Sequence, residues 1–143
     1  MIPMTILIDT TVILDILEQR ASFFESSYEI IQLGIHEKVR ILISANGITD
    51  IYQVINRRLH DADIARAKIL EFSRIIEVTN TMAQDIHTAL TSSIPDFESA
   101  VLASIAKREN VRYIVTRNEA NFAESPVTAM SPEKFIAEGL RQY

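Results

Sequence analysis

Short apolar runs alternate along the chain with longer segments in which apolar residues recur every three or four positions. Four runs rich in isoleucine and valine stand at 4–9 (MTILID), 41–44 (ILIS), 75–79 (IIEVT) and 113–116 (YIVT). Such runs are typical of strands buried on both faces of a parallel sheet. A weaker run at 126–129 (PVTA) is a fifth candidate strand. The pattern therefore predicts a sheet of four to five strands.

The segments between these runs have the spacing of amphipathic helices. Three apolar stripes have intervals of three and four residues, at 24–35, 48–59 and 82–90. Asp61 is a candidate N-cap for a helix, and Ser131 followed by Pro132 is typical of a helix start. The segment 97–106 (FESAVLASIA) is apolar on nearly all sides, which predicts a buried helix.

Strands that alternate with helices predict an α/β fold with a parallel sheet. The 143 residues fit a single domain, 1–143. In open α/β sheets, ligands bind beyond the carboxyl ends of the strands. Residues that follow the predicted strands are therefore the first candidates for chemistry.

Composition narrows the classes of function. Fourteen basic and nineteen acidic residues give a formal charge of −5, which disfavours a globally basic nucleic-acid binder but leaves a local basic patch open. The absence of cysteine excludes disulfides, thiolate zinc sites and cysteine nucleophiles. No apolar run reaches the roughly 18 residues of a membrane span, and no basic stretch precedes the first run. We expect a cytoplasmic protein without a membrane partner.

Three aspartates stand where predicted strands and helices meet. Asp9 closes the first strand, Asp50 lies one turn into the helix after the second strand, and Asp96 begins the buried helix. Each has a structural alternative, because Asp9 and Asp96 can cap helices and a helix N-terminus favours Asp50. Two carboxylates about 4 Å apart repel by about 4 kcal/mol at an effective dielectric of 20. A cluster of three needs a proton or a cation, and Mg²⁺ or Mn²⁺ suits oxygen ligands.

Further polar residues stand close to these aspartates. Asp96 and Ser99 are three apart and share a helix face, whereas Glu98 is expected to point elsewhere. The last strong strand closes with Thr116, Arg117 and Asn118. Arg117 is the candidate for contact with a phosphate. The mixed-charge segment 57–74 is typical of a solvated face, with RNA contact as its alternative.

Four blocks of the sequence occur in a specific order. They are 6–17 (ILIDTTVILDIL), 43–55 (ISANGITDIYQVI), 95–110 (PDFESAVLASIAKREN) and 112–122 (RYIVTRNEANF), and the segment 131–140 (SPEKFIAEGL) follows them as a closing helix. Together they cover nearly the whole chain, and they resemble the PIN domain, specifically the PIN-domain ribonuclease toxins of prokaryotic toxin–antitoxin modules. The resemblance implies a three-layer α/β/α sandwich with a central, mostly parallel sheet.

The resemblance also implies an activity, cofactors and partners. It implies endonucleolytic cleavage of RNA that depends on Mg²⁺ or Mn²⁺. Asp9, Asp50 and Asp96 would hold the metal, and Asn118 would join them as a catalytic residue. A homodimer and a cognate antitoxin protein are the implied partners besides the RNA substrate.

The chain departs from the family pattern at several positions. Ser99 aligns with the main third acid, Asn118 with the fourth, and Asn121 with a frequent aspartate, while Thr11 stands where asparagine is common. The three remaining carboxylates favour one metal ion over two. A PIN-fold module that binds RNA or protein without catalysis is the alternative function. A phospho-acceptor receiver domain is a third hypothesis, disfavoured because the first strand ends in a lone Asp9 followed by two threonines, where a receiver needs a pair of acids.

Overall fold

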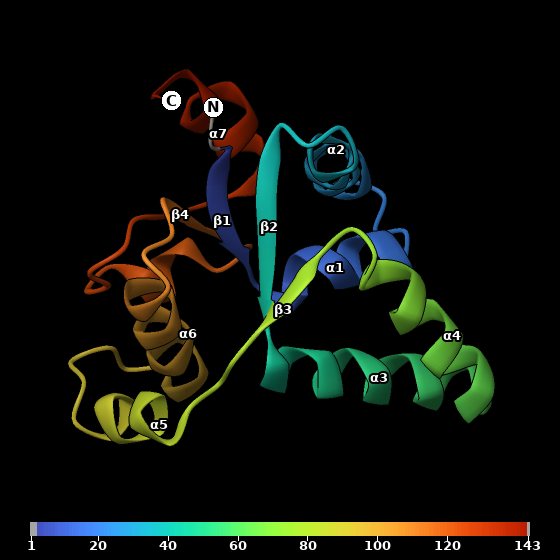
Figure 1. Ribbon diagram of the computed structural model, residues 1–143, viewed down its shortest axis with the longest axis horizontal. Helices are drawn as coiled ribbons and strands as arrows, with labels where there is room; N and C mark the ends of the chain where they lie inside the picture. Colours follow the sequence, from blue (N-terminus) through green and yellow to red (C-terminus); the bar gives the residue numbers. More distant parts are fainter. Residues whose placement is uncertain (1–2, 143) are drawn as a thin grey trace.

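The computed structural model of the chain describes residues 3–142 and has a five-stranded sheet at its centre (Figure 1). The strands are β1 (Met4–Ile8), β2 (Val39–Ser44), β3 (Glu77–Thr79), β4 (Tyr113–Val115) and β5 (Ala129–Met130). They lie in the order β3-β2-β1-β4-β5, and every neighbouring pair is parallel. The predicted α/β class and the parallel sheet are confirmed.

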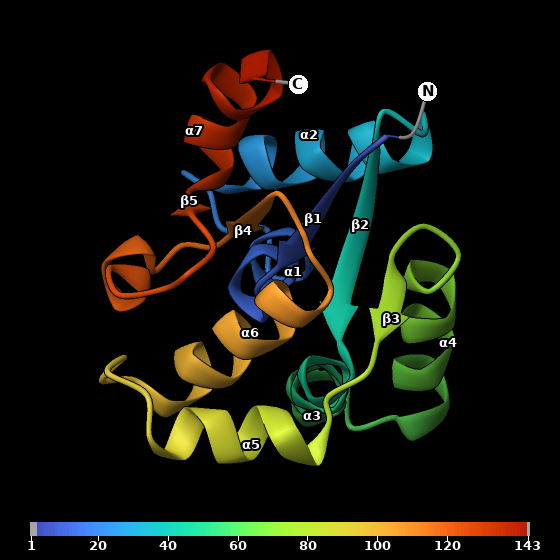
Figure 2. The same ribbon diagram turned by 60° about the vertical axis from the view of Figure 1, so that its left-hand side comes forward.

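Helices cover both faces of the sheet (Figure 2). They are α1 (Thr10–Leu17), α2 (Phe24–Ile35), α3 (Ala45–Leu59), α4 (Ala62–Phe72), α5 (Ala83–Leu90), α6 (Phe97–Arg108) and α7 (Pro132–Ala137), with 3₁₀ turns η1 (Glu119–Phe122) and η2 (Gly139–Gln142). One core joins α1, α2, α3, α4 and α7 to the sheet, and a second core joins α5 and α6 to the opposite face. This arrangement is the three-layer sandwich that the resemblance implied. No helix within residues 3–142 has the length and apolar character needed to cross a membrane.

The central strand divides its side chains between the two cores. Ile6 and Ile8 of β1 belong to the first core and Leu7 belongs to the second, and all three are fully buried. Successive residues of a strand point to opposite faces, so a strand covered on both sides is apolar at every position. The continuous run of isoleucine and leucine therefore follows from the central place of β1.

The register of the sheet brings several strand ends together. In β1 and β2, Leu7 pairs with Leu42, and in β1 and β4, Ile8 pairs with Val115. The amide of Asp9 continues this pairing by donating to the carbonyl of Val115 at 2.9 Å. The carboxyl ends of β1, β2 and β4 consequently share one edge, where α1 and α3 also begin.

Two predicted strands are shorter than expected. The run at 75–79 contributes only Glu77–Thr79, because the amides of Ile75 and Ile76 bond to the carbonyl of Phe72 at the end of α4. The fifth strand begins at Ala129, near the end of the predicted segment 126–129.

The predicted helices and helix starts are confirmed. The side chains of Asp61 and Ser131 cap α4 and α7 as expected. The helix 97–106 is largely buried, also as expected.

The predicted stripes of α2 and α5 are less buried than expected. In α2, Tyr28 and Ile35 are 44 % and 46 % exposed. In α5, Leu90 is 67 % exposed, and only Ala89 of the predicted stripe is buried.

A buried charge network ties the end of β4 to three helices. Asp15 of α1 is fully buried, and its Oδ2 accepts hydrogen bonds from Nε of Arg117 at 2.6 Å and from Oγ of Ser27 at 2.9 Å. The same guanidinium donates to the carbonyl of Phe23 and to Glu133 at the start of α7. Arg117 thus neutralises a carboxylate that burial would otherwise make costly.

We predict that Arg117→Leu lowers the free energy of unfolding by roughly 3–5 kcal/mol, because Asp15 would remain buried without its main counter-charge. Urea denaturation measures the change. Arg40→Leu is the matched control, since Arg40 forms an exposed pair with Glu77 at 2.7 Å and such pairs contribute under about 1 kcal/mol. Equal losses in the two variants would contradict the role given to Arg117.

Candidate active site

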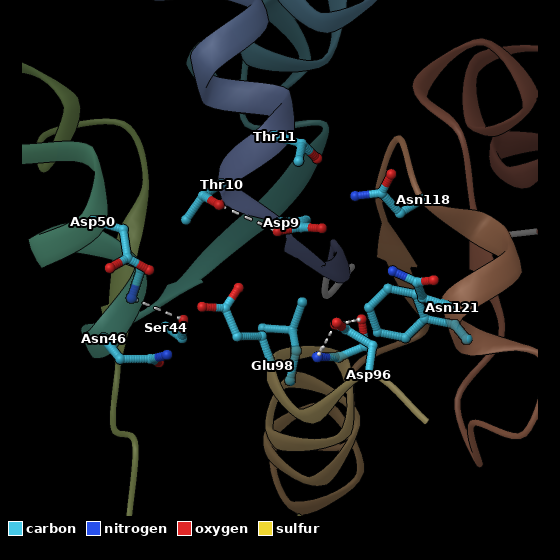
Figure 3. A pocket seen from close by; sticks show the side chains of 14 residues that line it. Asp9, Thr10, Thr11, Ser44, Asn46, Asp50, Asp96, Glu98, Asn118 and Asn121 are labelled. Atoms are coloured by element: carbon cyan, nitrogen blue, oxygen red, sulfur yellow. Dashed lines mark hydrogen bonds between the residues drawn. The ribbon is translucent and has the colours of Figure 1, made fainter. Parts of the chain in front are cut away.

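A polar pocket of about 100 Å³ lies at the carboxyl edge of the sheet, and fourteen residues line it (Figure 3). Its polar lining comprises Asp9, Thr10, Thr11, Ser44, Asn46, Asp50, Asp96, Glu98, Ser99, Asn118 and Asn121. The residues come from the ends of β1 and β2, the first turn of α1, the first two turns of α3 and α6, and the segment around η1. Segments far apart in the sequence therefore meet here.

The carboxylate of Asp9 is held by two threonine hydroxyls. Its Oδ2 accepts a hydrogen bond from Oγ1 of Thr116 at 2.8 Å, and its Oδ1 accepts one from Oγ1 of Thr10 at 3.3 Å. Thr116 is fully buried, and its hydroxyl also accepts the amide of Asn118 at 3.0 Å. Within the described residues, the Asp9 side chain makes no capping bond to α1. The cap interpretation of Asp9 is therefore wrong.

Asp50 reaches the pocket from the second turn of α3. The cap of this helix is Ser44, whose Oγ accepts the amide of Gly47 at 3.2 Å. A Cβ at Gly47 would lie 2.9 Å from Cγ2 of Thr10, so a larger residue would push α3 away from the start of α1. The close approach of the two helices keeps Asp50 and Asp9 on one pocket.

Asp96 has a structural role at the start of α6. Its Oδ2 accepts the amide of Ser99 at 3.0 Å and the hydroxyl of Ser99 at 2.6 Å. The cap interpretation of Asp96 is therefore confirmed. Both bonds use the same oxygen, and Asp96 still lines the pocket. Its other oxygen, Oδ1, is available to a ligand.

The sequence predicted that Glu98 points away from Asp96 and Ser99, and this prediction is wrong. Its carboxylate enters the pocket from α6 and points toward Asp9 and Asp50 (Figure 3). Partial burial raises the pKa of Glu98, and the negative charges of Asp50, Asp96 and Asp9 raise it further. The four carboxylates therefore share one electrostatic field.

The donor set suits a hard cation, although the side chains are not yet gathered around one point. In the part of the chain that the structure describes, no three His, Asp or Glu side chains are arranged to bind a single metal ion. Carboxylate oxygens are nevertheless the ligands that Mg²⁺ and Mn²⁺ prefer. Asp50 and Glu98 are exposed and can rotate toward Asp9, which is held by Thr116. Asp96 stays bonded to Ser99 through Oδ2 and offers only Oδ1. The chemistry of the pocket fits a divalent ion after this rotation.

Three helix N-termini offset part of the negative charge. The helices α1, α3 and α6 all begin at residues that line the pocket or adjoin it. A helix N-terminus carries roughly half a positive charge and can bind an anion through its free amides. The same ends that stabilise the carboxylates can thus attract a phosphate group.

Arg117, the basic side chain expected to contact phosphate at this edge, has a structural role. It does not line the pocket, and its guanidinium is engaged by Asp15, Ser27 and Glu133. Among the described residues that line the pocket, there is no Lys, Arg or His. The structure therefore gives Arg117 a role in holding helices together.

The polar residues of this edge differ in how far the sequence revealed them. Asn118 and Asn121 were predicted, and both line the pocket. Thr116 was also predicted, but it acts by holding Asp9. Ser44 and Asn46 were missed, although they stand at the end of β2 and satisfy the strand-end rule that selected Asp9.

The fold and the pocket define the class of protein. A model of the PIN domain family matches residues 5–120, and the chain belongs to this family. Among curated proteins, it is similar to Ribonuclease VapC1 of Aquifex aeolicus (strain VF5), with 24 % identity over 135 residues, which cover 91 % of this chain and 92 % of the relative.

Solved structures share the fold at low sequence identity. DNA-bound VapBC from Salmonella typhimurium has a TM-score of 0.67 and 15 % identity, covering 90 % of this chain and 98 % of the other. VapBC-1 from nontypeable Haemophilus influenzae has a TM-score of 0.67 and 14 % identity, covering 92 % and 100 %. The sarcin–ricin loop cleaving toxin VapC20 of Mycobacterium tuberculosis has a TM-score of 0.57 and 14 % identity, covering 76 % and 86 %.

We predict that Glu98→Gln raises the thermal midpoint at pH 7 in metal-free buffer. Because the folded protein raises the pKa of Glu98, its charged form opposes folding above the ordinary pKa, and this penalty disappears when the carboxyl is protonated. The gain should therefore shrink as the pH falls from 7 toward about 4. Calorimetric scans over this range measure it. Glu71→Gln, an exposed acid of α4 outside the pocket, is the control. A rise in the thermal midpoint that does not vary with pH would contradict the claim that the neighbouring carboxylates raise the pKa of Glu98.

Proposed function

We propose that this protein is a metal-dependent endoribonuclease of the toxin type, which hydrolyses phosphodiester bonds in RNA. The observation that carries the proposal is the meeting of Asp9, Asp50, Asp96 and Glu98 in one pocket at the carboxyl edge of the sheet. Membership of the PIN domain family supports it, as does the similarity to a protein named a ribonuclease.

In this proposal each residue has a defined task. Asp9, held by Thr116, would bind Mg²⁺ or Mn²⁺ together with Asp50 and the free oxygen of Asp96, and Glu98 would complete the set. A bound divalent ion stabilises the growing negative charge on a phosphate and makes water a better nucleophile. The positive ends of the three helix dipoles favour the negative phosphate at this edge.

The balance of charge favours one ion. Four carboxylates line the pocket, and three helix N-termini of roughly half a positive charge each offset them in part. One divalent ion then neutralises most of the remainder. Two ions would leave the pocket positively charged until a substrate phosphate arrived. We therefore propose a single Mg²⁺ or Mn²⁺ per site.

A cognate antitoxin is the proposed protein partner. A structure with this fold from Klebsiella pneumoniae is a toxin–antitoxin complex, which supports this proposal. The homodimer stays a prediction of the sequence resemblance.

A second candidate function is a PIN-fold module that binds RNA or protein without catalysis. The observation that favours it is the hydrogen bond of Ser99 to Asp96, which leaves a neutral hydroxyl where the family pattern has an acid. Asn118 and Asn121 likewise add no charge to the pocket. The two functions differ in whether RNA is cut.

We predict that the purified protein cleaves RNA with Mg²⁺ or Mn²⁺. Asp9→Asn and Asp50→Asn should each lower the cleavage rate by more than about 100-fold. Removing a residue that only hydrogen-bonds to a metal ligand typically costs about 10–100-fold, and removing the ligand itself should cost more. Thr116→Val should fall within that 10–100-fold range. Asp63→Asn, outside the pocket on α4, is the matched control. Undiminished cleavage in both Asp9→Asn and Asp50→Asn would refute the site. RNA binding without cleavage by the wild type would favour the second candidate.

We also predict that Ser99→Asp binds Mn²⁺ about tenfold more tightly than the wild type. A carboxylate at this position, which is only 6 % exposed, would add a negative charge close to the proposed ligands and contribute an attraction on the order of 1–2 kcal/mol. Isothermal titration calorimetry measures the affinity, and the neutral Ser99→Asn is the control. Equal affinity in the two variants would contradict the assignment of metal binding to this pocket.

A further inference from the structure

Asn46, which the proposed chemistry does not use, lies in the first turn of α3 and lines the pocket. Its side-chain Oδ1 accepts a hydrogen bond from Oγ1 of Thr81 at 2.7 Å. Its backbone amide donates to the same hydroxyl at 3.3 Å. Thr81 belongs to the loop between β3 and α5, so this pair joins two neighbouring segments beside the pocket.

The bond from Thr81 fixes the orientation of the Asn46 amide. Because Thr81 donates to Oδ1, this atom is the carbonyl oxygen, and the NH₂ group occupies the other position. Figure 3 shows the amide end of the Asn46 side chain directed toward the centre of the pocket. Within the described residues, Nδ2 makes no hydrogen bond in this arrangement. The pocket therefore contains an oriented donor without an internal acceptor.

A substrate phosphate needs such donors in this pocket. The lining includes four carboxylates and no Lys, Arg or His among the described residues, so no side-chain cation meets the phosphate. Arg117 is held by Asp15 and Glu133 and cannot take that role without breaking the buried pair. A neutral amide can donate to a phosphate oxygen without competing with the carboxylates for a metal ion.

We infer that Asn46 is a substrate-binding residue whose Nδ2 donates a hydrogen bond to a non-bridging oxygen of the RNA phosphodiester. Thr81 acts through Asn46 as the positioning residue. This inference rests on the proposed ribonuclease function and adds to it the group that recognises the phosphate.

Asn46→Asp separates substrate binding from a purely structural role. The aspartate keeps an acceptor for Thr81 and so preserves the link between the two segments. It replaces the pocket-facing donor with an oxygen that repels phosphate. Asn46→Ala removes the donor without adding charge, and Gln53→Glu introduces the same change of amide to acid on an exposed position of α3 outside the pocket.

The experiment measures kcat and KM for a fluorescein-labelled single-stranded RNA with Mn²⁺, and Mn²⁺ affinity by calorimetry. We expect KM to rise about tenfold in Asn46→Asp and Asn46→Ala, as for loss of a hydrogen bond to a charged group, while kcat changes by less than about threefold. Thr81→Val should raise KM by a smaller factor, and Thr81→Ser should restore it. Gln53→Glu should match the wild type, and Mn²⁺ should bind Asn46→Ala as it binds the wild type.

Wild-type KM in Asn46→Asp and Asn46→Ala, in a protein that cleaves RNA, would overturn the inference and leave the ribonuclease proposal intact. If the wild type does not cleave, fluorescence anisotropy of the same RNA decides. Binding weakened about tenfold in both Asn46 variants would support the phosphate contact while the cleavage proposal fails. Unchanged binding, or no binding by the wild type, would overturn the inference as well.

Discussion

The hydrogen bond from Thr116 to Asp9 joins residues 107 positions apart. It forms because β1 and β4 pair in parallel, and the arrangement of the site depends on this pairing. The strands β2 and β4 lie on either side of β1 and run parallel to it, so the carboxyl ends of all three strands reach one edge of the sheet. The helices that follow β1 and β2 start at this edge. The N-termini of these two helices lie beside the carboxylates. A single topological constraint thus supplies both the acidic side chains and the positive helix ends that make their proximity tolerable.

Positive side chains close to this edge serve the fold, which leaves the pocket acidic. Arg117 follows β4 directly, yet its guanidinium turns to the buried Asp15 and to Glu133. Since no basic side chain lines the pocket in the described chain, no side-chain cation of the protein neutralises the field of Asp9, Asp50 and their neighbours. Such a field attracts a divalent ion, and it leaves recognition of a phosphate to neutral donors.

The sequence predicted the parts of the fold and site that local pattern determines. The apolar run that ends at Asp9 and the start of the buried helix at Asp96 were both found from neighbouring residues. Glu98 was misjudged because helical spacing relates it to Asp96 but does not reveal how α6 is rotated against the sheet. Arg117 was misjudged because Asp15, its main partner, is 102 positions away. The stripe on α5 is largely exposed because this helix packs mainly against α6, a contact that periodicity cannot show.

The most direct test of the account is a crystal structure of the protein soaked in Mn²⁺, with the metal located by its anomalous scattering. The account predicts one peak in the pocket, within bonding distance of Asp9 and of at least one carboxylate oxygen from Asp50, Asp96 or Glu98. Anomalous density only outside the pocket, or none at saturating Mn²⁺, would contradict the claim that these acids form a metal site.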